Sequence, residues 1–247
     1  MRNIKLTIQY EGTNYSGWQF QTNGTSIQET IQKALGKITE EEISLKGASR
    51  TDAGVHALGQ VAVFKTNSNA PLSAFKEGLN SLLPDDIIVT EAKEVDPSFD
   101  PNKLALKKWY RYCIQMGENN SILSKRYSWH VKKSLDLKAM AEASKYFLGE
   151  KDFKSFQAAN TDIKTSVRNI HSIAFEYGPL DLLFIDFTAN GFLKYMVRNI
   201  VGTLVDVGLG KTKPLDVKEI IESRDRREAG PTAPPCGLFL VEIYYSD

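Results

Sequence analysis

Cysteine and histidine are scarce in this sequence. Its 247 residues contain two cysteines, Cys113 and Cys236, and three histidines that are widely separated from one another and from the cysteines. Two cysteines are too few for a framework of disulfide bonds, and a zinc site needs Cys or His ligands at short, regular spacings. We therefore expect neither a metal site nor a fold held together by disulfide bonds.

Long hydrophobic runs are lacking as well. The most apolar window, residues 192–209, is interrupted by Lys194, Arg198, Asn199 and Asp206, whereas a membrane-spanning helix needs about 18 apolar residues in succession. The first residues do not resemble a secretory signal peptide. The sequence thus predicts a cytoplasmic protein that does not insert into a membrane.

Net charge of either sign is small. The 31 Lys and Arg residues are balanced by 30 Asp and Glu residues, which leaves a formal charge of +1 at pH 7. A protein that binds nucleic acid through its overall field is usually strongly basic, so any such binding must depend on local patches. Candidate phosphate contacts are Lys103, Lys107, Lys108 and Arg111; Lys125 and Arg126; Lys132 and Lys133; and Arg224, Arg226 and Arg227.

The rest of the composition, with 42% hydrophobic and 25% charged residues, is typical of a folded domain. Alternating apolar residues predict strands, and apolar residues three or four positions apart predict helices. In the first half we expect strands at residues 4–10, 43–45, 60–65 and 87–89, and helices at 27–38, after a capping box of Ser26 and Glu29, and at 72–83. In the second half we expect strands at residues 110–116, 166–177, 182–187 and 238–245, and helices at 135–148, 192–207 and 215–223.

Each half therefore has the element order β-α-β-β-α-β, with one extra helix in the second copy. We predict an α+β fold of two ferredoxin-like halves, residues 1–102 and residues 103–247. Their strands are expected to form one continuous mixed or antiparallel sheet, with the helices packed on one face. The other face would then be available for binding.

The segment Gly47–Ala57 is crowded with functional side chains. Arg50 and Asp52 lie two residues apart, between Gly47 and Gly54, and glycine adopts backbone angles that other residues avoid. A nearby guanidinium favours the ionised carboxylate, so Asp52 could act as a nucleophile. An aspartate that caps a turn and pairs with a neighbouring arginine would have the same spacing. The spacing alone leaves both interpretations open.

Residues 49–57 read SRTDAGVHA, which resembles the active-site motif of the tRNA pseudouridine synthase I family. Further segments similar to that family occur in order over essentially the whole chain. They are Gly17–Gln19 with Gln28, Leu79–Pro84, Lys108–Tyr112, Asp152–Phe156, Val167–Ile170, Phe192–Leu204 and Ala233–Leu238. The ordered agreement favours the catalytic interpretation of Asp52.

The resemblance implies an isomerase that converts uridine to pseudouridine in the anticodon stem-loop of tRNA, at tRNA positions 38, 39 and 40. It implies a homodimer that needs no cofactor and no metal. Asp52 is implied to be the nucleophile, with Arg50, Tyr110 and Arg198 as further catalytic residues; whether Asp52 attacks the sugar or the base, or acts through a glycal route, stays open. The residues implied to bind substrate are Thr51, Gly54, His56, Lys108, Tyr110, Arg111 and Lys194.

Two of these residues also have plain structural interpretations. Tyr110 shares the parity of Tyr112 and Ile114 in its strand and could simply pack in the core. Arg198 lies four residues after Lys194, so the two could form a solvated basic stripe on a helix. By resemblance, Tyr110 stacks on the uracil ring and Arg198 pairs with the catalytic carboxylate.

The chain departs from the family at residues 99–102. Where the family often reads Phe-His-Ala-Arg, this chain has Phe-Asp-Pro-Asn and so loses a cation that could contact RNA. The departure leaves open which tRNAs are substrates.

Two other classes of function agree with parts of the sequence. A non-catalytic RNA-binding protein could stack bases on Trp109 and Tyr110, although the usual RNP motif is absent. A glycoside hydrolase would need two carboxylates about 5–10 Å apart, and the loop offers one.

Overall fold

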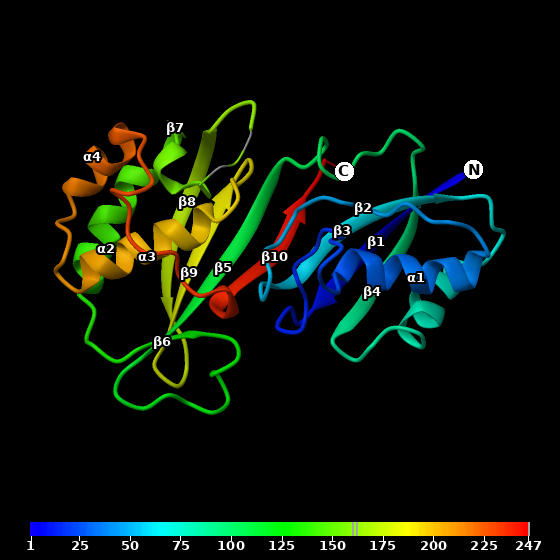
Figure 1. Ribbon diagram of the computed structural model, residues 1–247, viewed down its shortest axis with the longest axis horizontal. Coiled ribbons are helices and arrows are strands. Elements are labelled where there is room, and N and C mark those ends of the chain that lie inside the picture. Colours follow the sequence, from blue (N-terminus) through cyan, green and yellow to red (C-terminus); the bar gives the residue numbers. More distant parts are fainter. Residues whose placement is uncertain (160, 162, 247) are drawn as a thin grey trace. The chain divides into compact units, whose positions relative to one another are not determined.

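The computed structural model describes residues 1–246 except 160 and 162. The described residues form ten strands and four α-helices, and the fold is mixed α/β, as predicted (Figure 1). The chain divides into two compact units. The first comprises Met1–Leu106 and the C-terminal segment from Phe239, and the second comprises Lys107–Leu238.

The first unit has the strand order of a ferredoxin-like fold. Strand β1 lies between β4 and β3, antiparallel to both, and β2 pairs antiparallel with β3. The order β4-β1-β3-β2 is that of the βαββαβ motif, in agreement with the prediction. The elements are β1 (Arg2–Tyr10), α1 (Ile27–Thr39), β2 (Lys46–Gly47), β3 (His56–Thr66), the π-helical turn η1 (Ala74–Gly78), β4 (Ile87–Val95) and β10 (Leu238–Tyr244).

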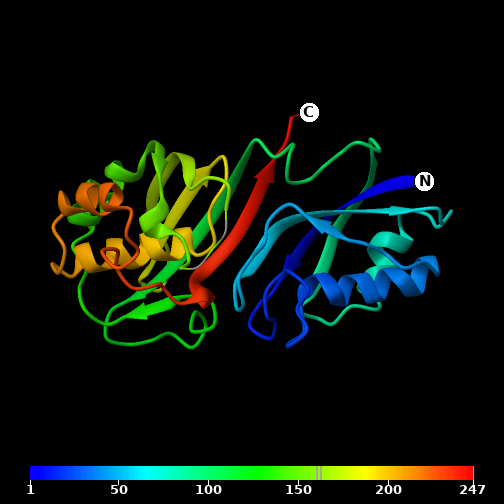
Figure 2. The ribbon, with the colours of Figure 1, turned by 45° about the horizontal axis from the view of Figure 1, so that its top comes forward.

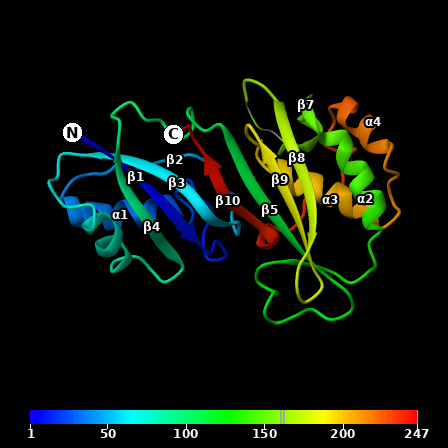
Figure 3. The same ribbon diagram turned by 180° about the vertical axis from the view of Figure 1, so that it is seen from behind.

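Helix α1 covers one face of these strands. It lies in front of them in Figure 1 and behind them in Figure 3. Ser26 caps the helix by accepting a hydrogen bond from the backbone N–H of Glu29, as the capping box predicts. The apolar side of the helix buries Ile27, Ile31 and Leu35, as expected from their spacing.

The second unit contains an antiparallel sheet with a different set of helices. Strand β9 lies between β5 and β8, β7 adds to β8, and the short β6 pairs parallel with β5. Helices α2, α3 and α4 lie on one side of these strands (Figures 1 and 2). The elements are β5 (Lys107–Met116), β6 (Trp129–Val131), α2 (Leu137–Ser144), η2 (Lys145–Phe147), β7 (Gly149–Asp152), η3 (Lys154–Phe156), β8 (Val167–Tyr177), β9 (Leu182–Ala189), α3 (Met196–Gly208), α4 (Asp216–Ser223) and η4 (Pro235–Gly237).

The two faces of strand β5 differ sharply. Tyr110 and Tyr112 are buried, and their partners on β9, Phe187 and Ile185, are fully buried as well. Arg111 belongs to the opposite face, where it is paired with Asp186. The alternation follows from the two-residue period of a strand, which sends neighbouring side chains to opposite faces.

The predicted helix at residues 72–83 is wrong in extent. A shorter helical segment forms there, consisting of the π-helical turn at Ala74–Gly78 continued by Leu79 and Asn80. Asn80 explains where it ends, because its side chain exchanges two hydrogen bonds with the backbone of Val89, at 2.8 and 2.9 Å. Pro84 closes the segment.

Other predicted boundaries also shift. Helix α3 begins at Met196 instead of residue 192, because Tyr195 has a left-handed backbone with φ of +66° that interrupts the helix. The predicted helix at 135–148 splits into α2 and the 3₁₀ turn η2. The strand expected at 43–45 is wrong, since only Lys46–Gly47 pairs with β3. The short strands β6 and β7 were not predicted.

The last strand, β10, connects the end of the chain to the first unit. It pairs parallel with β3, with Phe239 opposite His56 and Leu240 opposite Ala57. Gly59 allows the close approach, because a Cβ at that position would lie 2.4 Å from the carbonyl oxygen of Val241. The compact first unit therefore includes a segment that the sequence grouped with residues 103–247.

No helix in the described part of the chain is long and apolar enough to cross a membrane.

Candidate active site

The loop that carries Asp52 lies between β2 and β3 of the first unit. One buried side chain that holds it is Gln60 on β3. The Gln60 Oε1 atom accepts a hydrogen bond from the backbone N–H of Ser49, and Nε2 donates to the carbonyl oxygen of Ser49, at 3.2 and 2.8 Å. Gln60 Nε2 also lies 3.4 Å from the hydroxyl of Tyr10. One amide thus satisfies both backbone groups at the start of the motif.

Two glycines outside the motif press against the same loop. Gly17 has φ of +101°, and a Cβ there would lie 2.6 Å from the carbonyl oxygen of Thr51. A Cβ at Gly12 would lie 2.0 Å from the carbonyl oxygen of Val55. Trp18, next to Gly17, donates its backbone N–H to the carbonyl oxygen of Thr51 at 3.1 Å. The backbone on both sides of Asp52 is therefore held by direct backbone contacts.

Asp52 itself is half-buried at the centre of a tight turn. Its carbonyl oxygen accepts a hydrogen bond from the N–H of Val55 at 3.2 Å, and Gly54 has φ of +75°. The neighbouring Thr51 is buried, and its Oγ1 lies 2.7 Å from the hydroxyl of Tyr10. Arg50 is exposed. Consecutive residues thus present one exposed cation and one half-buried carboxylate from a rigid loop.

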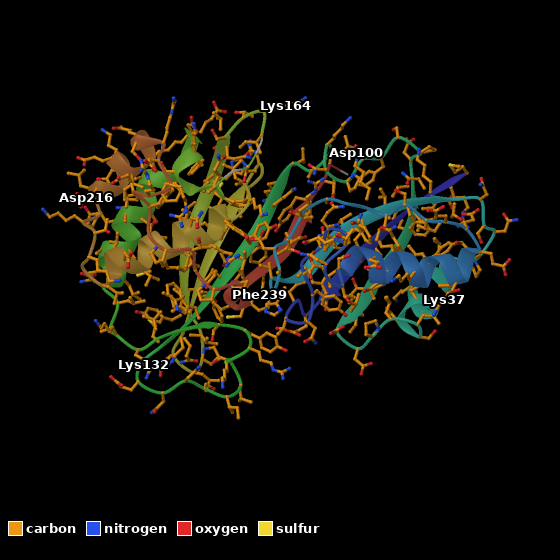
Figure 4. The ribbon with its side chains drawn as sticks, viewed as in Figure 1. Lys37, Asp100, Lys132, Lys164, Asp216 and Phe239 are labelled. Atoms are coloured by element: carbon orange, nitrogen blue, oxygen red, sulfur yellow. The ribbon has the colours of Figure 1, made fainter. Side chains whose placement is uncertain are left out.

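His56 lies in the interior of the first unit, with 1% of its surface exposed. Its Nδ1 accepts a hydrogen bond from the backbone N–H of Gly12 at 3.1 Å and lies 3.5 Å from a carboxylate oxygen of Glu11. Its ring stacks on Phe239, which Figure 4 labels, with centroids 4.8 Å apart. These contacts make His56 a support for the loop from within the unit.

Tyr110 and Arg198 lie in the second unit. Tyr110 is 6% exposed, and its ring meets Phe192 edge-on, with centroids 5.1 Å apart. Arg198 occupies the first turn of α3 and is half-buried. Its Nε donates to the carbonyl oxygen of Ala233 at 2.7 Å, and its guanidinium lies 4.9 Å from the centroid of the Tyr195 ring. Protein contacts therefore hold the guanidinium of Arg198 in place, which disagrees with the interpretation of Arg198 as part of a solvated basic stripe.

Lys194 and Lys108 are cations of contrasting surroundings. Lys194 is exposed, with its Nζ 5.3 Å from the centroid of the Tyr195 ring. Lys108 is 8% exposed, and burial together with the nearby charge of Arg168 lowers its pKa to about 8. Lys108 is therefore protonated in only part of the molecules near pH 8.

Arg111 faces away from Tyr110. Its guanidinium forms two hydrogen bonds with the carboxylate of Asp186, at 2.7 and 2.8 Å, and an ion pair with Glu176 at 3.0 Å. Asp186 also accepts a hydrogen bond from the indole of Trp109 at 2.9 Å. The carboxylate of Asp186 raises the pKa of Arg111 above its ordinary value. Two acidic residues thus neutralise a cation that the sequence marked as a substrate contact.

The departure at residues 99–102 has a structural role. Asp100 forms an ion pair with Lys46 at 2.6 Å and accepts hydrogen bonds from the backbone N–H groups of Asn102 and Lys103. The Lys46 ammonium lowers the pKa of Asp100 below its ordinary value. Tyr245 donates to the carbonyl oxygen of Pro101 at 2.8 Å. The lost cation is replaced by a turn that ties the chain to the C-terminal strand.

The structure thus groups the sequence-predicted residues in three places. Arg50, Thr51, Asp52 and Gly54 share one loop of the first unit, supported by His56. The second unit holds the next three. Lys108 and Tyr110 lie on the side of β5 that α3 covers, and Arg198 lies in α3 itself. Arg111 lies on the other face of β5. Sequence reasoning missed Tyr10, Gly12 and Gln60. The paired glycines after the first strand, in the segment Gly12–Gly17, were the available signal.

A separate cavity of about 610 Å³ lies in the second unit. It contains none of the predicted catalytic residues. Its lining combines four cations, two carboxylates and two uncharged side chains, namely Lys145, Lys151, Lys218 and Arg224, Asp152 and Glu222, and Tyr146 and Ile221. Arg224 pairs with Asp152 across it at 3.0 Å.

Comparison with known proteins gives one family. The sequence profile described as tRNA pseudouridine synthase matches residues 6–102 and 143–246. Over 245 residues, the chain is 46% identical to tRNA pseudouridine synthase A of Thermoanaerobacter sp. (strain X514), 49% identical to tRNA pseudouridine synthase A 2 of Clostridium perfringens and 48% identical to tRNA pseudouridine synthase A of Acetivibrio thermocellus. Each alignment covers 99% of this chain and 100% of the relative. The chain therefore belongs to the tRNA pseudouridine synthase family of enzymes.

Proposed function

We propose that this enzyme isomerises uridine to pseudouridine in the anticodon stem-loop of tRNA, at positions 38, 39 and 40, with Asp52 as the nucleophile. The observation that carries the proposal is the clamped loop. Gln60 and Gly17 hold the backbone on the N-terminal side of Asp52, and the tight turn to Val55 holds the other side. A fixed carboxylate needs no reorganisation when it reacts.

The reaction breaks the N1–C1′ bond of uridine, rotates the uracil and forms a C5–C1′ bond. The proton on C5 leaves, and a proton is taken up at N1, so no atom is gained or lost. The carboxylate of Asp52 supplies the electron pair, either by attack on C1′ or on the base, or by promoting a glycal route. None of these routes needs a redox partner, and the proposal includes no cofactor.

Tyr110 and Arg198 are proposed to act on the same uridine. Tyr110 would hold the uracil ring against its own ring and keep its phenol near C5, where a proton must leave. Arg198 would pair with the carboxylate of Asp52 and keep it ionised. Support for Arg198 comes from its fixed geometry, since Ala233 and Tyr195 orient its guanidinium.

The target uridine must leave its stack to reach the carboxylate. Flipping a base costs about a few kcal/mol, which contacts with the phosphate backbone must offset. Exposed cations such as Arg50 and Lys194 are proposed to make some of these contacts with the phosphate backbone. Arg111 is a weaker candidate, because Asp186 and Glu176 already neutralise it.

We further propose that the enzyme acts in the cytoplasm as a homodimer.

The experiment that tests the function uses unmodified tRNA made by transcription in vitro. After incubation with the purified protein, pseudouridine is mapped by carbodiimide modification and primer extension. We expect new stops at positions 38 to 40, in tRNAs that carry uridine there, and none with heat-denatured protein. No pseudouridine, or pseudouridine only outside the anticodon stem-loop, would contradict the proposal.

A further inference from the structure

Arg226 is an arginine whose donors point into the protein. Its Nη2 donates to Oδ1 of Asn199 and to Oγ1 of Thr232, both at 3.0 Å. Its Nη1 donates to the carbonyl oxygen of Ala229 at 3.1 Å. None of the ion pairs among the described residues includes Arg226, and burial lowers its pKa below the ordinary value. A half-buried charge held by neutral acceptors is costly, so the arrangement calls for an explanation.

Asn199 makes the centre of this arrangement rigid. It is fully buried in α3, directly after Arg198. Its Nδ2 donates to the carbonyl oxygen of Phe156 at 2.8 Å, so its Oδ1 faces the opposite way and accepts from Arg226 and from the hydroxyl of Thr232, the latter at 2.7 Å. All donors and acceptors of the group are consistent, which fixes the orientation of the amide.

The network ends at Arg198. Thr232 is followed by Ala233, whose N–H donates to the carbonyl oxygen of Arg198 at 3.1 Å and whose own carbonyl oxygen accepts from Nε of Arg198 at 2.7 Å. The Ala233 carbonyl is therefore one of the contacts that orient the Arg198 guanidinium. The position of this carbonyl depends on the segment that Thr232 and Arg226 hold.

Backbone packing against α3 holds the first part of this segment. A Cβ at Gly202 would lie 1.7 Å from the carbonyl oxygen of Pro231, and one at Gly230 would lie 2.7 Å from Cα of Thr203. The N–H of Gly230 donates to Oγ1 of Thr203 at 2.9 Å. Gly230 and Pro231 are thus pressed against α3, and Arg226 adds hydrogen bonds on either side of them, to Ala229 and to Thr232.

We propose that Arg226 is a positioning residue that fixes the guanidinium of Arg198 through Thr232 and the carbonyl group of Ala233. Lysine is not equivalent here, because the planar guanidinium directs two nitrogens at the three acceptors in a fixed geometry, whereas lysine presents its donors from one nitrogen. The inference rests on the proposed role of Arg198. Under this proposal Arg226 is not one of the phosphate contacts, although the sequence predicted that role from its position in a basic cluster.

The test compares three variants in single-turnover release of tritium from tRNA that carries 5-tritiated uridine, together with tRNA binding at several salt concentrations. Arg226→Lys keeps the charge and loses the fork. We expect it to slow the rate at saturating enzyme about 10- to 100-fold, as displacement of a reacting group by about 1 Å does. Thr232→Val removes only the hydroxyl group and should slow the rate about tenfold. For both variants the dissociation constant for tRNA and its salt dependence should stay at the wild-type values.

The control variant is Lys213→Gln, an exposed cation of the same unit outside this network, which should keep the wild-type rate. Melting curves give the folded fraction of every variant, and rates are expressed per folded molecule. A merely structural Arg226 would lower the melting temperature and leave that rate unchanged, which would overturn the proposal. A phosphate contact would weaken binding and lower the salt slope by about one at an unchanged saturating rate, which would overturn it too.

A double-mutant cycle separates this inference from the proposed function. If Arg226 acts through Arg198, adding Arg226→Lys to Arg198→Lys should slow the reaction no further. Independent, multiplicative effects would contradict the positioning role. A wild-type protein that releases no tritium, or an Arg198→Lys variant with the full rate, would instead refute the proposed function or the proposed role of Arg198.

Discussion

The loop of Asp52 and the start of helix α3 are both held rigidly, but by different means. The loop of Asp52 is held by backbone groups, by close approaches at two glycines and by the amide of Gln60. Around Arg198 the contacts run through a second arginine, a buried asparagine and a carbonyl group. Neutral backbone contacts keep their geometry over a wide range of pH and salt concentration. Side-chain networks add positional control, and a conservative substitution can disturb them without unfolding the chain.

The closest backbone approach in the two regions is at Gly202, in the helix α3 that carries Arg198. We therefore expect Gly202 to tolerate replacement least. Gly202→Ala would place a Cβ 1.7 Å from the carbonyl oxygen of Pro231, and neither backbone can move away without loss of packing. We expect a loss of about 3 kcal/mol or more in the free energy of unfolding, measured in urea. Gly191→Ala, whose Cβ would meet only the Arg168 side chain at 3.8 Å, is the control. Equal stability of the two variants would contradict the packing argument.

In the first region, Gln60 should be the side chain with the largest effect. Gln60→Leu removes both partners of the buried Ser49 backbone and should lower the free energy of unfolding by about 2–4 kcal/mol, because two buried polar groups lose their hydrogen bonds. The tritium-release rate should fall as well. Gln32→Leu loses one hydrogen bond, to the carbonyl oxygen of Ile43, and serves as the comparison, with an expected loss of about 1 kcal/mol. A smaller effect at Gln60 than at Gln32 would show that the loop does not depend on it.

Lys108, a buried cation of the second unit, is expected to make the free energy of unfolding depend on pH. Folding lowers its pKa from 10.5 to about 8, so between these values the unfolded chain binds more protons than the folded chain. Its unfavourable effect on folding is therefore complete below pH 8 and disappears as the pH rises to 10.5. The difference in unfolding free energy, wild type minus Lys108→Met, should rise by about 2 kcal/mol over this range. A difference independent of pH would contradict the effect of burial on Lys108.

The smallest effect is expected at Tyr10. Tyr10→Phe removes the hydroxyl that lies 2.7 Å from Oγ1 of Thr51 and leaves the ring in place. The free energy of unfolding should fall by about 1 kcal/mol, with little change from pH 6 to pH 9, since the contact is neutral. Chemical denaturation at both pH values measures this. A strong pH dependence of the loss would contradict a neutral contact between Tyr10 and Thr51.

Much of the fold could be predicted from periodicity and capping. Strand β1, helix α1 with its Ser26 cap, and the hairpin of β8 and β9 follow local rules that the sequence displays openly. The errors have tertiary causes. Asn80 turns away from a helix to bind the backbone of β4, and Tyr195 takes a left-handed backbone that delays the start of α3. Such contacts join distant parts of the chain and leave no local pattern.

The candidate site was predictable only where a motif carries it. Asp52 stands in a segment similar to a known family, so its chemistry could be anticipated. Gln60 and Gly17 could not, because their role depends on which backbone atoms they meet after folding. Arg226 was placed among phosphate contacts from its basic neighbours, whereas its donors are directed at Asn199 and Thr232. Charge clustering in a sequence does not report the direction of a side chain.

The most direct test of the account is the rate of tritium release by Asp52→Asn from tRNA that carries 5-tritiated uridine. The substitution replaces one carboxylate oxygen with an amide nitrogen and leaves in place Gln60 and the backbone hydrogen bonds of Thr51 and Val55 that hold the loop. We expect release to fall about a thousandfold or more, with the melting temperature and the dissociation constant for tRNA near the wild-type values. Release at the wild-type rate would contradict the claim that this carboxylate performs the chemistry.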